Sequence, residues 1–228
     1  MTADLYTNRF TDSDAKAKNV LWREVCRFLA RYVDGPVLDI GCDRGYFIRN
    51  IAASERWATD LRDVSADMPA NVRFVQGGGL DLERLVPNGY FGTVFMSNYL
   101  EHLRTRDDVL EQMRVAHALL RPGGRVVVLQ PNIRLVGPAY WDFIDHHVAL
   151  TEKSLVEAAD SAGFQTERLI VRFLPYTTKS RLPQSAALVR WYLRVPIAWR
   201  LLGGQTLYVG RASYSQTSQP DTSPASAP

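Results

Sequence analysis

The sequence predicts an α/β fold in which a doubly wound, mostly parallel sheet carries helices on both faces. First, short apolar runs alternate with helical or turn segments along most of the chain, as expected of buried parallel strands joined by crossover helices. Second, glycine and proline separate these runs, at Gly35-Pro36, Pro122-Gly123-Gly124 and Gly163. Third, the alternation stops after Gly163. Two strands follow without a crossover helix, so we expect an antiparallel pair at the end of the sheet.

Each element is inferred from its periodicity and its boundaries. Apolar residues recur at helical spacing from Asp14 to Val33, and Asp12 or Ser13 can cap that helix. Seven strands are expected, of which the last along the chain is antiparallel: Val37–Gly41, Arg56–Leu61, Val72–Gln76, Gly92–Asn98, Arg125–Pro131, Gln165–Phe173 and Thr206–Ala212. Further helices are expected at Tyr46–Ala53, Thr105–Leu120 and Thr151–Ala162.

The 228 residues suit one main domain with a sizeable core. We expect an N-terminal helical cap at 1–34, the α/β domain at 35–212 and a disordered tail at 213–228. An insert at about 174–205 is rich in aromatic residues and arginines. Its segment 183–202 carries a helical apolar stripe flanked by arginines, and Pro196 must end or kink any helix there. Packing on the sheet, a lid, a homodimer interface or peripheral membrane contact would each use such residues.

Composition and charge narrow the class of protein. Apolar residues make up 46% of the chain and charged residues 22%, as in ordinary soluble domains. The N-terminus lacks the layout of a signal peptide, so we expect a cytoplasmic protein. Cys26 and Cys42 are interpreted as small apolar fillers. The net charge of +3 conceals eight basic and no acidic residues between Arg168 and Arg211. The basic segment has four interpretations: it contacts phosphate, an anionic membrane or an acidic substrate, or it is simply exposed to solvent.

A glycine-rich turn follows the first predicted strand. The apolar run 37–40 contains Asp39 and is followed by Gly41 and Gly45 before a helical pattern begins. Glycine lets a ligand approach the backbone closely, and a helix N-terminus offers free N–H groups to a polar ligand. Many α/β proteins have such a turn, so the turn alone does not define a function.

Four stretches with a characteristic order and spacing indicate the function more closely than the turn alone. They are 37–47, Trp57-Ala58-Thr59-Asp60-Leu61, 91–103 and 119–128, the last containing Pro122-Gly123-Gly124. From about Val37 to Phe173 the chain resembles the class I S-adenosylmethionine-dependent methyltransferases. The resemblance implies a Rossmann-like seven-stranded sheet, S-adenosylmethionine as cofactor and transfer of its methyl group. The run 130–184 is similar to bacterial members associated with glycan genes, which favours a small-molecule or glycan-type acceptor with a hydroxyl or amine.

The resemblance also implies where the cofactor binds. Gly41 and Gly45 would admit its methionine portion, Asp39 would organise the ammonium end, and Asp60 would accept both ribose hydroxyls. Leu61 would pack on the face of the adenine. Backbone groups at Gly79 and Leu80 would bind its edge. The full expected set is Asp39, Gly41, Asp43, Gly45, Asp60, Leu61, Gly79, Leu80 and Asn98.

Three positions depart from the family's pattern. Asp43 replaces a usual glycine, Gly78 stands where an acid that bonds the adenine amino group is expected, and Gly92 replaces a frequent acid. Asp81 can substitute for the missing acid if the register shifts. These departures motivate an alternative function as a degenerate, non-catalytic binding or scaffold subunit. A nicotinamide-dependent oxidoreductase is a lesser alternative, because the turn lacks the three glycines that approach a pyrophosphate.

Acceptor-side candidates follow the fourth and fifth predicted strands. His146 and His147 are the candidate catalytic bases, because histidine suits proton transfer near neutral pH. In the alternative interpretation they are loop histidines bonded to Asp142 or Asp145. His102, Asn132, Tyr140 and Trp141 are the candidate acceptor-binding residues. No metal is expected, because adjacent histidines rarely point the same way and the sequence shows no obvious third ligand. No nucleic-acid partner is expected either, because the chain lacks a basic-aromatic strip or a zinc cluster.

Overall fold

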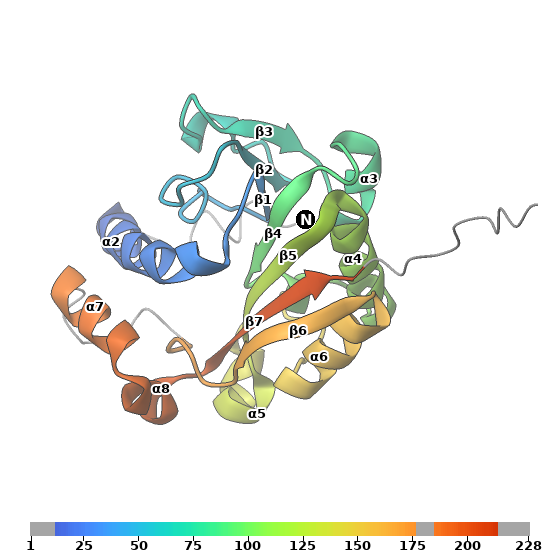
Figure 1. The fold of residues 1–228 in the computed structure, drawn as a ribbon. Helices are drawn as coiled ribbons and strands as arrows, with labels where there is room; N and C mark the ends of the chain where they lie inside the picture. Colours follow the sequence, from blue (N-terminus) through green and yellow to red (C-terminus); the bar gives the residue numbers. More distant parts are fainter. Residues whose placement is uncertain (1–11, 177–184, 214–228) are drawn as a thin grey trace, which may run out of the picture.

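The computed structural model describes residues 12–176 and 185–213 (Figure 1). Seven strands form one sheet in the order β3-β2-β1-β4-β5-β7-β6. Six strands run in one direction, and β7 runs antiparallel to both of its neighbours, β5 and β6. The strands are β1 (Val37–Ile40), β2 (Arg56–Asp60), β3 (Arg73–Gln76), β4 (Phe91–Ser97), β5 (Leu120–Pro131), β6 (Phe164–Ile170) and β7 (Gln205–Ala212). The predicted doubly wound sheet with its antiparallel last strand is confirmed.

Helices cover both faces of this sheet (Figure 1). On one face lie α3 (Leu82–Leu85), α4 (Arg106–Leu119) and α6 (Glu152–Ser161), which pack on side chains such as Leu38 and Val126. On the other lie α2 (Asp12–Leu29), α7 (Ala186–Arg194) and α8 (Pro196–Leu202), which pack on Val37 and Val127. The shorter helices are η1 (Ala30–Tyr32), η2 (Ser65–Asp67), η3 (Gly79–Asp81), η4 (Leu100–His102), α5 (Ile133–Val136) and η5 (Gly137–Asp142).

Helix boundaries follow local chemistry. Thr105 and Thr151 form capping boxes at the starts of α4 and α6, each satisfying backbone N–H groups that the helix leaves free. Pro196 stands at the start of α8, directly after α7 ends, because proline fits the first helical turn but not a helix interior. The predicted break at Pro196 is thereby confirmed.

The helix predicted for Tyr46–Ala53 was wrong. The chain there makes a run of turns in which helical bonds, such as Arg49 N–H to the Gly45 carbonyl (3.1 Å), mix with tighter ones. The guanidinium of Arg49 and the amide of Asn50 donate to the carbonyls of Arg44, Gly45 and Tyr46. At Tyr46 a side chain therefore occupies the carbonyl that a regular helix would bond through the backbone N–H of Asn50. The predicted tail beyond residue 213 lies outside the described residues.

An ion pair joins the N-terminal helix to the C-terminal insert. The Glu24 carboxylate of α2 is 2% exposed and accepts two bonds from the Arg190 guanidinium of α7, at 3.0 and 3.1 Å. The pKa of Glu24 is lowered, chiefly by its hydrogen bond with Arg190. This bidentate pair fixes α7 against the domain. Within 12–176 and 185–213, no helix has the length and hydropathy needed to span a bilayer.

Candidate functional site

The candidate site lies where the parallel strands β1, β2, β4 and β5 end. Because these strands run in one direction, the segments that follow them meet at one edge of the sheet, where ligands bind in open α/β folds. The turn after β1 and the residues after β2 form one part of this edge. The segment after β4 and the loop after β5 form the other.

The turn after β1 has a backbone that few side chains tolerate. Gly41, Asp43 and Gly45 all have positive φ, at +68°, +49° and +67°. Asp43 is the non-glycine residue that replaces the family's usual glycine, and aspartate is among the residues best able to adopt this conformation. Its N–H donates to Asp60 Oδ2 at 3.0 Å, which ties the turn to the end of β2. The turn therefore keeps its form despite the substitution.

Asp39 is buried at the end of β1 with 3% exposure. Its Oδ2 atom has no hydrogen-bond partner among the described residues. Its pKa is raised, first by burial and then by the negative charge of Asp60. A buried carboxyl with an orphaned oxygen is costly unless a donor or a positive group meets it. The ammonium group of a methionine moiety would supply both.

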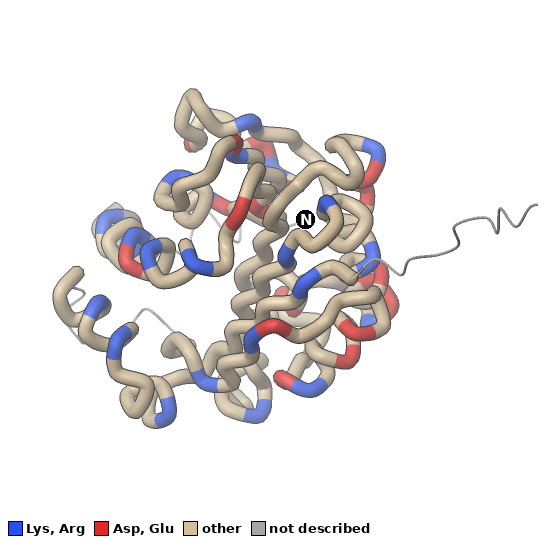
Figure 2. The backbone as a smooth tube through the Cα atoms, viewed as in Figure 1, with Lys and Arg blue, Asp and Glu red and all other residues tan. Residues whose placement is uncertain are grey.

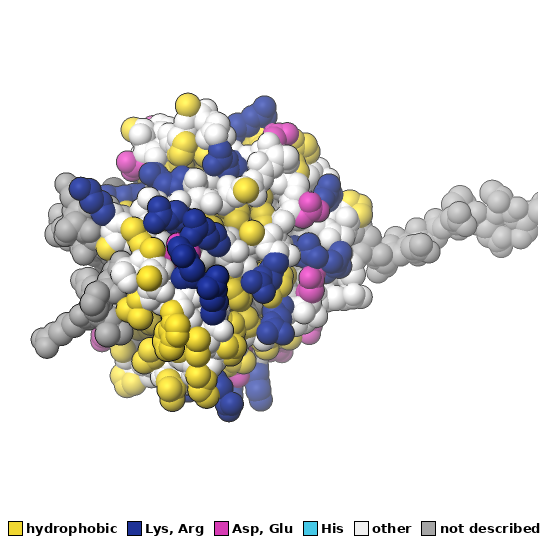
Figure 3. Space-filling view, turned by 60° about the vertical axis from the view of Figure 1, so that its left-hand side comes forward, with side chains coloured by type: hydrophobic (Ala, Val, Ile, Leu, Met, Phe, Trp, Pro, Cys, Tyr) yellow, Lys and Arg dark blue, Asp and Glu magenta, His cyan; other side chains and the backbone are white. Residues whose placement is uncertain are grey.

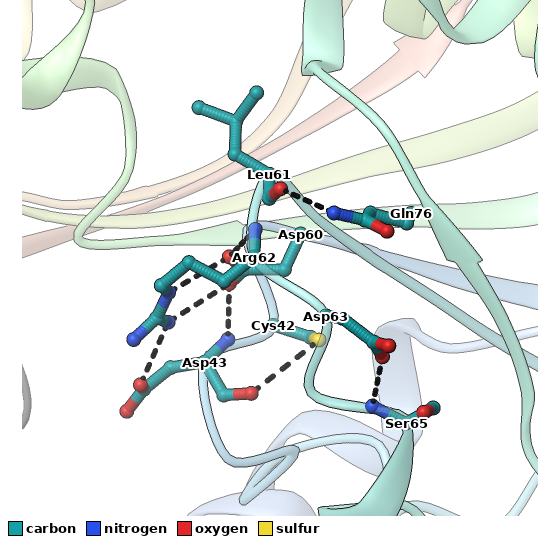
Figure 4. A network of polar contacts seen from close by, with 8 residues as sticks. All are labelled: Cys42, Asp43, Asp60, Leu61, Arg62, Asp63, Ser65 and Gln76. Carbon is teal, nitrogen blue, oxygen red and sulfur yellow. Dashed lines mark hydrogen bonds and ion pairs between the residues drawn. The ribbon is translucent and has the colours of Figure 1, made fainter. Parts of the chain in front are cut away.

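Asp60 lies at the centre of a polar network (Figure 4). Its Oδ1 accepts from the backbone N–H and Nε of Arg62, each at 3.0 Å. Its Oδ2 accepts from Asp43 N–H at 3.0 Å and from Arg62 Nη2 at 3.1 Å. The same guanidinium contacts Asp43 Oδ1 at 3.0 Å. A carboxylate offers about four acceptor positions, so Arg62 and Asp43 already occupy those of Asp60.

The expected adenine side shows exposed apolar groups beside an acid. Leu61 is 76% exposed and Leu80 is 36% exposed. A Cβ placed on Gly78 would lie 3.4 Å from Leu61 Cδ2 and 3.4 Å from Asp81 Oδ2. The Asp81 carboxylate therefore sits next to the position where the family's acid would begin. Its role as a substitute for that acid stays a prediction, now with a geometric basis.

Tyr99, which follows β4, is a residue that our sequence reasoning missed. A Cβ on Gly41 would lie 2.5 Å from Tyr99 Cδ2, and a Cβ on Gly79 would overlap the Tyr99 hydroxyl. That hydroxyl donates to Gln112 Oε1 of α4 at 2.8 Å. Tyr99 therefore packs against two expected cofactor-binding segments at once. Asn98 beside it is exposed and has a φ of +47°.

The expected acceptor side brings Glu101, His102, Asp145 and His146 together. The backbone N–H groups of His147 and Val148 donate to the Glu101 carbonyl at 2.8 and 3.2 Å, which joins the loop after β5 to η4. The rings of His102 and His146 meet edge to face, with centroids 5.0 Å apart. This arrangement was not foreseen, although the pair Glu101-His102 lies in a stretch that carries the family resemblance.

Hydrogen bonds fix the tautomers of both histidines. His102 Nδ1 lies 2.9 Å from the Asp145 carbonyl oxygen and 3.4 Å from its Oδ2. His146 Nδ1 lies 2.7 Å from the Tyr140 carbonyl oxygen. A carbonyl oxygen only accepts, so the proton of each neutral ring sits on Nδ1 and the acceptor lone pair on Nε2.

Glu101 is 1% exposed, and neither carboxyl oxygen has a hydrogen-bond partner in another described residue. Burial raises its pKa to about 8 against the smaller opposing effect of its own backbone N–H, and the charge of Asp145 adds to the rise. A buried carboxyl of this kind makes Glu101 a candidate functional residue.

The other expected acceptor residues lie differently. His147 is exposed, and the contacts above involve its backbone. Asn132 is fully buried, and its amide donates to Glu152 and Thr206 and accepts from Arg134 N–H. With its amide fully engaged, Asn132 caps α5, and we do not retain it as an acceptor ligand.

The two aromatic candidates, Tyr140 and Trp141, lie in different environments. Tyr140 is also fully buried, donates its hydroxyl hydrogen to the Val148 carbonyl at 2.6 Å and packs edge-on against the His146 ring. Trp141 is 52% exposed and remains a candidate wall.

Comparisons with known proteins identify the class. The profile of the methyltransferase domain family matches residues 14–169, more than half of the chain. The chain therefore belongs to this family, and its cofactor is S-adenosylmethionine. None of the curated proteins compared with the chain matches it.

Solved structures share the fold at low identity. One comes from the complex between the Haloferax volcanii Trm112 methyltransferase activator and a methyltransferase (15% identity, TM-score 0.62, 89% of this chain and 96% of that chain). Another is a SAM-dependent methyltransferase from Archaeoglobus fulgidus (17% identity, TM-score 0.61, 85% and 94%). A third is an S-adenosylmethionine-dependent methyltransferase from Mesorhizobium loti (18% identity, TM-score 0.58, 82% and 95%). At these identities the likeness concerns the fold.

Proposed function

We propose that the protein is an active methyltransferase that methylates a hydroxyl or amine of a small-molecule or glycan-type acceptor. The observation that carries this proposal is the meeting of two unlike clusters at one sheet edge. The turn after β1 and the Asp60 network follow β1 and β2. The histidine-carboxylate cluster follows β4 and β5. A cofactor side and an acceptor side thus face the same edge.

The cofactor side fits S-adenosylmethionine. Asp39 would meet the ammonium group with its orphaned oxygen, and Asp60 would accept the ribose hydroxyls once Arg62 releases part of its carboxylate. Leu61 would cover the adenine, with Asp81 at its amino group. When bound, the cofactor supplies a methyl group already activated on a sulfonium. The protein's task is then to position the acceptor, which is worth about 7–11 kcal/mol in the best cases.

The acceptor side handles the proton. His146 is held by the Tyr140 carbonyl with its acceptor lone pair on Nε2, which is the form that a general base needs. A base of this kind accelerates proton transfer by about 10²–10⁴-fold. His102 lies beside it in the same tautomer, and Trp141 offers an exposed aromatic surface for an acceptor ring. Of the two adjacent histidines, His146 is the base, and His147 lies outside the cluster.

One observation favours the alternative of a non-catalytic binding subunit. Arg62 and Asp43 fill the acceptor positions of Asp60, so cofactor binding must displace hydrogen bonds that already exist. A structural neighbour assembled with a methyltransferase activator offers a precedent for function within a complex. Family membership leaves the nicotinamide alternative without support.

Calorimetry with S-adenosylmethionine separates these functions. We expect micromolar binding that Asp60→Ala weakens by at least tenfold, about 1.4 kcal/mol. Asp63→Ala, which removes a neighbouring acid that accepts from Ser65 N–H, is the matched control and should bind as the wild type does. A folded wild type that binds no cofactor would favour the non-catalytic subunit.

Turnover is tested with an acceptor screen among sugars and lipid-linked glycans. With any acceptor found, His146→Gln should lower kcat by about 10²-fold while cofactor affinity is kept.

A further inference from the structure

We propose that Glu101, His102 and His146 form a binding site for a divalent transition-metal ion on the acceptor side. One potential ligand atom from each residue lies within 4.8 Å of the other two. Ligands at about 2.1 Å from one ion lie at most about 4.2 Å apart, so small side-chain rotations complete the set. No metal was expected from the sequence, where His146 stands next to His147 and neighbouring residues rarely point the same way. The fold instead supplies His102 and Glu101 from the segment after β4.

The chemistry of the donors supports this site. Glu101 is 1% exposed and has no hydrogen-bond partner in another described residue, and a buried carboxylate is stable when it is paired or ligates a metal. Both imidazoles place their Nδ1 proton on a backbone carbonyl. This is the supporting arrangement that orients metal-binding histidines and leaves Nε2 as the ligand atom. Two imidazoles with one carboxylate suit Zn²⁺, Mn²⁺, Fe²⁺ or Co²⁺ better than Mg²⁺.

The site also specifies an acceptor class, an inference that rests on the proposed function. Three protein ligands leave coordination positions open for a substrate. An ion there would hold an acceptor through oxygen atoms and lower the pKa of a hydroxyl that it ligates. The acceptors that fit best carry two adjacent oxygen donors, such as vicinal hydroxyls of a sugar or a hydroxyl beside a carboxylate. In this arrangement His146 acts as a ligand, and the ion takes over the task of acidifying the hydroxyl.

Metal binding is measured on the full chain after chelator treatment, by titration with Co²⁺ followed by visible absorption and calorimetry, and by competition with Zn²⁺. We expect one ion per chain at micromolar affinity or better. Glu101→Gln and His146→Gln should each weaken binding at least tenfold. His117→Gln, on α4 and bonded to the Ser213 carbonyl, should bind as the wild type does. Thermal unfolding checks that each variant folds, and His146→Gln decides the matter if the buried Glu101 variant does not.

Two results overturn the metal site: a folded wild type with no saturable Co²⁺ binding, or variants of Glu101 and His146 that bind as the wild type does. Cofactor calorimetry keeps this proposal separate from the proposed function. Cofactor binding without metal binding removes the metal site and leaves His146 as the base. Metal binding without cofactor binding keeps the site and removes the methyltransferase activity.

A different observation carries a second inference, on the surface of α7 and α8. Tyr192, Leu193, Ala198 and Trp199 pack inward, but four apolar side chains remain largely exposed: Trp191 (57%), Ile197 (60%), Leu201 (76%) and Leu202 (54%). Figure 3, which brings the α7–α8 side forward, shows hydrophobic side chains gathered beside Lys and Arg. Figure 2 shows Lys and Arg, and no Asp or Glu, along α7 and α8.

From this pattern we infer that the α7–α8 surface docks on an anionic membrane. Trp and aliphatic side chains beside arginines are typical of helices that lie in the lipid interface. Charge argues against the homodimer alternative. A twofold interface pairs the same surface of both copies, so Arg194 and Arg200 of one copy would face the segment 168–211 of the other, which has no acid. Anionic headgroups supply the missing negative charge.

Sedimentation with vesicles tests this surface. We expect the chain to sediment with phosphatidylglycerol vesicles, less so as salt rises, and to stay in solution with phosphatidylcholine alone. Trp191→Ala with Leu201→Ala should lower vesicle binding at least tenfold. Leu85→Ala, at an exposed leucine of α3, is the matched control. No binding to anionic vesicles, or a dimer in analytical ultracentrifugation that the double variant dissociates, overturns the inference.

Discussion

The cofactor side of the sheet edge is built from residues close in sequence, whereas the acceptor side joins residues far apart. The Asp43–Asp60 bond spans 17 positions, and the His102–Asp145 contact spans 43. On the cofactor side the backbone itself does the positioning, through three positive φ values in one turn. On the acceptor side, hydrogen bonds between loops and buried aromatic rings position the side chains. The first kind of construction depends on residues that permit a positive φ, and the second depends on contacts between distant side chains and loops.

The largest expected effect comes from filling the turn after β1. Gly41→Ala combines a positive φ with a Cβ 2.5 Å from the Tyr99 ring, so it should destabilise the fold by at least about 2 kcal/mol and abolish cofactor binding. Gly89→Ala has the same kind of φ, +63°, but nothing within 4 Å, and should cost about 1 kcal/mol with cofactor affinity unchanged. Urea unfolding and calorimetry measure both. Equal losses in the two variants would show that contact with Tyr99 does not matter.

On the acceptor side, Tyr140→Phe should destabilise the fold by about 1–3 kcal/mol, because it leaves the buried Val148 carbonyl without its donor. Tyr176→Phe removes a longer bond, 3.2 Å to the Ala139 carbonyl, from a partly exposed residue, and should cost less than about 1 kcal/mol. Urea unfolding gives both values. If Tyr140→Phe lowers the free energy of unfolding less than Tyr176→Phe does, buried contacts do not hold the loop after β5 in place.

The same difference explains what the sequence could predict. The succession of strands along the chain and the turn with Asp39, Gly41 and Gly45 follow from local patterns of polarity and glycine, and so does the acid that ends β2. The cluster of Glu101 with His146 depends on where the loop after β5 folds back onto η4, and no local pattern contains that information. For the same reason, Asn132 looked like a site residue although the fold uses it as a cap. Arg62 was overlooked because the side chain that fills the Asp60 carboxylate is defined only in three dimensions.

Arg62 gives a third, smaller prediction on the cofactor side. Removing its guanidinium frees two acceptor positions of Asp60, so Arg62→Ala should strengthen S-adenosylmethionine binding by about fivefold, close to 1 kcal/mol. Arg84→Ala, at an exposed arginine of α3, removes the same charge elsewhere and controls for the positive charge of the cofactor. Calorimetry compares the two. Weaker binding in Arg62→Ala would mean that this arginine positions Asp60 for the ribose and does not compete with it.

The smallest expected effect is at Asp43, where the chain departs from the family's usual glycine. Asp43→Gly removes the strain of a side chain at φ +49° but also the contact with Arg62 at 3.0 Å. The relief of strain and the loss of the contact have opposite effects on the free energy of unfolding, about 0.5–1 kcal/mol each. The free energy of unfolding should therefore change by less than about 0.5 kcal/mol. Asp43→Asn keeps the side chain and loses only the charge. It should bind the cationic cofactor a few-fold more weakly at unchanged stability. If Asp43→Gly instead raises both stability and cofactor affinity, the aspartate is a defect of the cofactor side and not a compensated substitution, and the non-catalytic alternative gains its first energetic support.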